Sequence, residues 1–128
     1  MSVIAHGIDL ISCSRVKEII ARHGDRFIAR VLTDRETEYV HSKRDPVPHI
    51  AGRFAAKEAI LKALGTGWRG KVSWRDMEVT NDHNGQPSVA LTGECADRAK
   101  KLGIERILIS ISHTEEFAQA SAIAVSSD

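Results

Sequence analysis

The chain has 128 residues, 42% of them hydrophobic, which suits a single domain (1–128) with one core. Its 18 Lys and Arg against 17 Asp and Glu leave a net charge of +1, so no overall field favours nucleic acid or a membrane. Cys13 and Cys95 fit neither a zinc set nor a disulfide framework, and no apolar run approaches membrane-spanning length. We therefore expect a cytoplasmic globular protein with two free thiols.

The first elements in chain order are a strand and two helices. Residues 3–10 carry branched and small apolar side chains without helical periodicity, as in a buried strand. A helix then begins at Ser12 or Ser14 and ends at Gly24. A short helix follows the capping box formed by Thr33 and Glu36.

The second half of the chain indicates mostly strands. We expect strands at 71–74, 77–80 and 88–91, the last two joined by an Asn84-Gly85 turn. A helix runs from Thr92 through Leu102, and strands at 107–112 and 118–126 form a hairpin across Glu115 and Glu116. The order of elements predicts an α+β domain, with an antiparallel sheet packed against a long central helix and shorter helices.

That long helix is the most informative segment. It enters through Asp45, Pro46 and Pro48, ends at Gly65, and is apolar on most sides. Glu58 and Lys62 lie four residues apart on one face, and together they could hold a metal and a phosphate. The alternative is an exposed, helix-stabilising ion pair.

Asp9 is a second isolated charge, at the end of a strand that otherwise reads as core. Ser12 and Ser14 lie closer to the helix start and can cap it, so Asp9 is left for another partner. Mg²⁺ takes one or two protein carboxylates and completes its shell with water and phosphate oxygens. Asp9 and Glu58 would suit it, provided that they meet in space.

Hydroxyls and an imidazole gather at a strand exit, in Ser110-Ile111-Ser112-His113-Thr114. Strand exits often carry ligand sites, although serines on a solvent-facing strand are also commonplace. The chain has no G-x-S-x-G elbow, Walker loop or G-x-G-x-x-G motif. Their absence removes the commonest hydrolase, NTPase and dinucleotide-binding interpretations.

A basic segment covers residues 15–30, with five Arg or Lys against two acidic residues. A solvated helix face is one interpretation, and a docking surface for an acidic partner is the other. Nucleic acid fits less well, because the aromatic residues are scattered and form no stacking platform.

These motifs together resemble the bacterial holo-acyl-carrier-protein synthases, the small group of 4′-phosphopantetheinyl transferases. The resemblance extends over nearly the whole chain and rests on four ordered blocks. They are Gly7-Ile8-Asp9-Leu10, Arg53 to Ala59 with Lys62 and Gly65-Thr66-Gly67, Asn81-Asp82 with Gly85 and Pro87, and Ser110 to Thr114.

The resemblance implies transfer of the phosphopantetheine arm from coenzyme A to a serine of apo acyl carrier protein, with adenosine 3′,5′-bisphosphate released. It implies Mg²⁺ on Asp9 and Glu58, catalytic roles for Glu58 and Lys62, and a homotrimer with interfacial active sites. The coenzyme A and carrier residues are assigned by the same resemblance: Arg53, Phe54, Lys62, Gly65 and His113 for the coenzyme, and Arg15, Arg22 and Arg26 for the acidic carrier protein.

Two other functions fit some of the same residues. A magnesium-dependent nucleotide phosphohydrolase would also use Asp9 and Glu58, with water as the acceptor. A non-catalytic adaptor would use only the basic segment.

Overall fold

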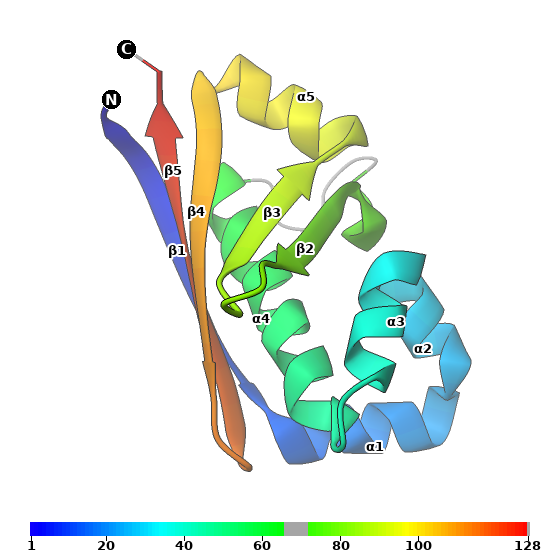
Figure 1. The fold of residues 1–128 in the computed structure, drawn as a ribbon. Coiled ribbons are helices and arrows are strands. Elements are labelled where there is room, and N and C mark those ends of the chain that lie inside the picture. The colour runs from blue at the N-terminus through cyan, green and yellow to red at the C-terminus, as the bar shows by residue number, and fades with distance from the viewer. Residues whose placement is uncertain (66–71, 128) are drawn as a thin grey trace.

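The protein is described by a computed structural model that covers residues 1–65 and 72–127. Three long strands form an antiparallel sheet in the order β1 (Val3–Ser12), β5 (Phe117–Ser126) and β4 (Ile104–His113). A separate hairpin pairs β2 (Met77–Asn81) with β3 (Pro87–Leu91). Figure 1 shows the hairpin beside the long sheet, with the longest helix between them.

That helix, α4 (Pro46–Leu64), packs along the inner face of the three-stranded sheet (Figure 1). Four alternate residues of β5 face it, and these are buried alanines: Ala118, Ala120, Ala122 and Ala124. Small side chains let a helix and a sheet approach closely. The helix is buried on most sides, as its sequence predicted.

The remaining helices surround this centre. Helices α1 (Cys13–His23), α2 (Asp25–Val31) and α3 (Asp34–His41) follow β1, and each of α1 and α3 contacts α4. Helix α5 (Gly93–Lys101) lies against β4 and the 3₁₀ turn η1 (Trp74–Asp76). None of the helices in the described ranges is both long enough and apolar enough to cross a bilayer.

The local signals at most boundaries are confirmed. Ser12 is the N-cap of α1, where its side chain accepts from Arg15 N at 3.3 Å. Thr33 and Glu36 form the capping box of α3. Gly85 has a φ of 83° in the β2–β3 turn, a value that favours glycine. The β4–β5 hairpin turns at residues 114–116, as expected.

Four points of the sequence-based prediction need correction. Residues 72–74 form no strand: Val72 and Ser73 are irregular and Trp74 begins η1, while Lys71 lies outside the described residues. The short helix α2 was not predicted, and the strands form two sheets where one was expected. Thr92 sits at the N-cap of α5 but gives it no side-chain bond; its hydroxyl donates to Asp76 O at 3.4 Å. The α+β class and the central helix are confirmed.

Candidate active site

The site begins where β1 crosses α4. Gly7 is buried on β1, and a Cβ at this position would overlap the carbonyl oxygen of Ala59 on α4. Only glycine permits this approach of strand to helix. Two residues further along β1, on the same face, comes Asp9. The close contact therefore sets Asp9 against the part of α4 that carries Glu58 and Lys62.

Asp9 and Glu58 line one cavity of about 540 Å³. The predicted residues Phe54 and Arg15 also line it. The structure thus brings together the two predicted metal ligands, one residue predicted for coenzyme A and one predicted for the carrier protein. Apolar neighbours from β1, α1 and β5 complete much of the wall: Leu10, Ile11, Val16, Ile19 and Phe117.

Lys62 contacts Asp9, one of the residues that line this cavity. Its Nζ lies 3.1 Å from Asp9 Oδ1 and donates to the Ile8 carbonyl oxygen at 2.8 Å. The Lys62 side chain is 53% exposed and the Asp9 side chain 16%. The ammonium is therefore fixed against β1 but still open to solvent, where it is accessible to a phosphate oxygen.

The second oxygen of Asp9 is available for a cation. Asp9 Oδ2 is buried and accepts no hydrogen bond from any described residue. A buried carboxylate oxygen without a donor is costly unless a cation or water satisfies it. No three His, Cys, Asp or Glu side chains gather as a ligand set in residues 1–65 and 72–127. Asp9 and Glu58 alone fit an ion that takes few protein ligands and several exchangeable oxygens, as Mg²⁺ does.

Arg53 and His113 line a different, smaller cavity of about 160 Å³. Arg53 is only 3% exposed, and its Nη2 donates to Asn81 Oδ1 at 2.7 Å. Its guanidinium lies 4.2 Å above the Tyr39 ring. His113, the last residue of β4, is exposed and contacts the His49 ring at 5.0 Å between centroids. Of the five residues predicted to bind coenzyme A, Arg53 and His113 thus line one cavity, Phe54 lines the other, and Lys62 contacts Asp9.

Sequence reasoning did not assign Tyr39 or His49 to this second cavity. The available signal was spacing, since His49 lies four residues before Arg53 on α4 and so shares its face.

Gly65 ends α4 with a φ of 70°, and its amide donates a hydrogen bond to Lys62 O. Thr66 and Gly67, which follow Gly65 in the second block of the resemblance, lie outside the described residues.

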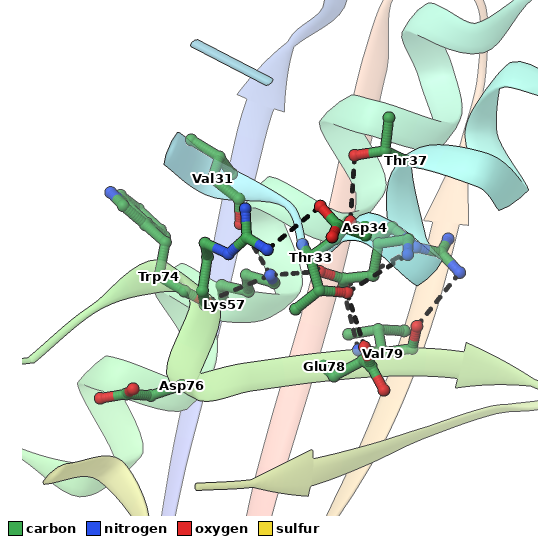
Figure 2. Close-up of polar contacts among 12 residues, drawn as sticks. Val31, Thr33, Asp34, Thr37, Lys57, Trp74, Asp76, Glu78 and Val79 are labelled. Carbon is green, nitrogen blue, oxygen red and sulfur yellow. Dashed lines mark hydrogen bonds and ion pairs between the residues drawn. The ribbon is translucent and has the colours of Figure 1, made fainter. Parts of the chain in front are cut away.

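A buried ion pair fixes α4 on the side away from the long sheet. Lys57 is fully buried, and its Nζ donates to Glu36 Oε1 at 2.5 Å and to the Val31 carbonyl oxygen at 2.7 Å. Figure 2 shows the Lys57 side chain between Val31 and Trp74. Glu36 also accepts from Val79 N on β2 at 2.9 Å. The pair therefore joins α2, α3, α4 and β2 and holds the helix that carries Glu58.

The basic segment is exposed on α1 and α2. Arg22 lies in the last turn of α1, and Arg26 lines a separate cavity of about 390 Å³ together with His23, Phe27 and Arg30. The Phe27 ring stacks on Phe54 at 5.9 Å between centroids, and Phe54 lines the Asp9 cavity. The cationic surface is thus connected to that cavity through packed aromatic rings.

Comparison with known proteins shows the family to which this chain belongs. The profile of the 4′-phosphopantetheinyl transferase superfamily matches residues 5–124. The holo-[acyl-carrier-protein] synthase of Chlamydia pneumoniae is 46% identical over 125 residues, which cover 98% of this chain and 99% of that protein.

Two solved structures share the fold. Holo-[acyl-carrier-protein] synthase from Neisseria meningitidis matches with a TM-score of 0.89 and 33% identity, over 97% of this chain and 99% of that one. The Bacillus anthracis enzyme in complex with CoA (3′,5′-ADP) matches with a TM-score of 0.80 and 35% identity, over 98% of both chains. The chain belongs to the holo-[acyl-carrier-protein] synthase family of the 4′-phosphopantetheinyl transferase superfamily.

Proposed function

We propose that the protein transfers the 4′-phosphopantetheine arm of coenzyme A to a serine of apo acyl carrier protein and releases adenosine 3′,5′-bisphosphate. The observation that carries this proposal is the cavity shared by Asp9 and Glu58, in a chain whose relatives are named for this activity. The related structure with CoA (3′,5′-ADP) supports coenzyme A as the donor.

Asp9 and Glu58 are the residues that would hold Mg²⁺. The buried, unsatisfied Asp9 Oδ2 and the second carboxylate on the same cavity support this assignment. When bound, the ion neutralises charge on the diphosphate of coenzyme A. Without a cation, the two carboxylates would repel the negatively charged diphosphate.

The chemical step is a displacement at phosphorus. The carrier serine oxygen forms a bond to the phosphorus that bears the pantetheine arm, and the bond from that phosphorus to the bridging oxygen of the diphosphate breaks. The leaving oxygen stays with adenosine 3′,5′-bisphosphate. Glu58 or a water molecule accepts the serine proton, and the half-exposed ammonium of Lys62 stabilises charge on the leaving group.

The basic residues Arg15, Arg22 and Arg26 dock the acidic carrier protein. Arg15 lines the Asp9 cavity itself, so a carrier bound on this surface presents its serine beside the two carboxylates. Complementary charge of this kind mainly accelerates and orients association.

The assembly is a homotrimer in this proposal, with the outer face of the long sheet as its contact. Residues opposite one another in neighbouring strands share a face, and His6, Ile123 and Leu108 form such a row. Ile8 and Leu10 continue this face, and its four large apolar side chains are all exposed. A contiguous group of exposed apolar side chains is typical of an interface.

Buried free thiols at Cys13 and Cys95 fit a cytoplasmic location.

The direct test is to incubate the protein with coenzyme A, Mg²⁺ and apo acyl carrier protein and to weigh the carrier by mass spectrometry. A phosphopantetheine adduct on the carrier serine is expected. Coenzyme A hydrolysis without an adduct would favour the phosphohydrolase, and carrier binding without either reaction would favour the adaptor.

Two variants locate the chemistry. Glu58→Gln keeps the shape of the side chain but removes its charge, so the adduct should form at least about a hundredfold more slowly. Glu38→Gln, an exposed carboxylate on α3, is the matched control and should retain the parent rate. Full activity of the folded Glu58→Gln protein would show that the Glu58 carboxylate has no role in the transfer.

A further inference from the structure

His49 lies in the first part of α4 and is partly buried in the cavity that Arg53 and His113 line. Its ring meets the His113 ring edge to face, with 5.0 Å between centroids and 65° between planes. On its other side it meets the Tyr39 ring, again at a steep angle, at 6.2 Å. His113 is exposed at the end of a strand, and its ring contact is with His49.

The cavity also contains a fixed cation. Arg53, one turn after His49, lies with its guanidinium over the Tyr39 ring and donates a hydrogen bond to Asn81 Oδ1. Its Nε is buried and lies 3.9 Å from Glu36 Oε2, an ion-pair distance too long for a hydrogen bond. Two imidazoles and a guanidinium thus converge on one small cavity, which is a typical arrangement for binding an anionic oxygen group.

The charged and titratable groups around His49 come from α3, α4, the segment before α4 and β4, while β2 and β3 contribute Asn81 and Pro87 to the cavity wall. The basic neighbours are Lys43 before α4, Arg53 on α4 and His113 on β4, the acidic one is Asp45 at the N-cap, and the Tyr39 ring of α3 packs beside them. Burial lowers the pKa of His49, the three basic neighbours lower it further, and Asp45 partly opposes them. These effects favour the neutral imidazole over the protonated form.

We propose that His49 is a positioning residue that orients His113 over this cavity and couples the binding of a phosphate-bearing ligand there to the uptake of a proton. The inference rests on the proposed function, in which coenzyme A is the donor, and on the resemblance that assigns Arg53 and His113 to that coenzyme. It adds a role for His49, a residue outside those motifs. A dianionic phosphate offsets the repulsion between neighbouring cations, so ligand binding favours protonated His49, and protonation reciprocally favours ligand binding.

The test measures the affinity for adenosine 3′,5′-bisphosphate between pH 6 and pH 8 in the parent, His49→Phe and His49→Ala. Each linked proton changes affinity by up to about tenfold per pH unit. Phenylalanine keeps the ring contact with His113 but cannot bind a proton. His49→Phe should match the parent within about threefold at pH 8 and fall about fivefold to tenfold behind it at pH 6. His49→Ala, which loses the ring, should bind more weakly at both pH values.

An affinity ratio of His49→Phe to parent that stays constant from pH 6 to pH 8 would overturn the proton coupling. Wild-type protein gives a second test that needs no variant: the pKa of His49, followed by NMR, should rise when the nucleotide is added, and an unchanged pKa contradicts the proposal. The carrier adduct assay at pH 8 reports separately on the proposed function. Adduct formation without proton coupling therefore rejects only the role of His49.

Discussion

Lys62 pairs across the helix–sheet contact with Asp9, at 3.1 Å between Nζ and Oδ1. The four-residue spacing of Glu58 and Lys62 is typical of an exposed pair on one helix, but the ammonium is held by β1 through Asp9 and the Ile8 carbonyl oxygen. Asp9 is consequently the shared residue of the site. One of its oxygens faces Lys62, and the other is buried without a donor in the described chain.

Replacing Lys62 by methionine should slow transfer without unfolding the protein. The Lys62 side chain is half exposed, so the free energy of unfolding should change by less than about 1 kcal/mol. Removal of a cation that stabilises the leaving group should reduce kcat at least about tenfold. Steady-state kinetics and urea unfolding measure the two quantities. Lys101→Met, an exposed lysine on α5, is the control, and equal kinetics for both variants would show that Lys62 has no role in the reaction.

Gly7→Ala should both destabilise the protein and impair the site. The new Cβ meets a helix carbonyl oxygen that cannot move alone, so β1 must shift away from α4 and carry Asp9 with it. Overpacking of this kind costs about 1–3 kcal/mol, which urea unfolding measures.

Gly52→Ala provides the matched control at another point of the helix–sheet interface. There the added Cβ would come within 2.9 Å of a side-chain methyl of Ile111, which can rotate away. Alanine also favours a helix over glycine by up to about 1 kcal/mol, which offsets part of the crowding. If Gly7→Ala proved as stable and as active as Gly52→Ala, the close approach at Gly7 would not position Asp9.

The buried pair of Lys57 and Glu36 should dominate local stability. Burial lowers the pKa of Lys57, and the carboxylate of Glu36 counteracts the shift. Lys57→Met removes the nearer of two cations from buried Glu36 and leaves only Arg53, whose Nε lies 3.9 Å from Oε2. This loss should cost about 3–5 kcal/mol in the free energy of unfolding. The double variant Lys57→Met with Glu36→Gln removes that buried charge and should recover part of the loss. A single variant within about 1 kcal/mol of the parent would contradict this.

Glu36 shows which part of the structure could be predicted from sequence. The Thr33–Glu36 capping box was visible because it depends on two residues three positions apart. The same carboxylate also binds Lys57 and Val79 N, and no local pattern reveals those partners. Val72 to Trp74 gave the opposite error: their side chains favour a strand, but Ser73 caps a 3₁₀ turn through a bond from Arg75 N.

The candidate site likewise has one part that could be predicted from sequence and another that could not. Residue types identified Asp9 and Glu58 as metal-binding candidates, and family resemblance supplied much of the function. The cavity that Asp9 and Glu58 share depends on the close contact of Gly7 with Ala59, two residues that are distant in the sequence. The second cavity combines Tyr39, His49 and His113 from α3, α4 and β4, so only the folded chain shows it. Helix α2 escaped prediction because it has seven residues and no side-chain cap.

Charge reversal at Arg22 should weaken recognition of the carrier protein selectively. Arg22→Glu places a like charge against an acidic partner, so KM for apo acyl carrier protein should rise about tenfold or more while KM for coenzyme A stays within about twofold. The effect should shrink as salt is added. Lys101→Glu changes the net charge equally at a distant exposed position and is the control. Equal increases in both KM values would contradict the docking role.

Cys95 should make the folded protein less stable in alkaline solution. Burial raises the pKa of its thiol to about 11, with further contributions from Asp76 and Glu94 that exceed the opposing effect of Lys57. In the unfolded chain the thiol ionises near 9.0, so the folded state retains a proton that the unfolded state releases. Its contribution to stability is complete below pH 9 and is lost as pH rises towards 11. Urea unfolding at pH 8.5, 9.5 and 10.5 should therefore show a steeper alkaline decline for the parent than for Cys95→Ala. Parallel declines would mean that the thiol titrates alike in both states.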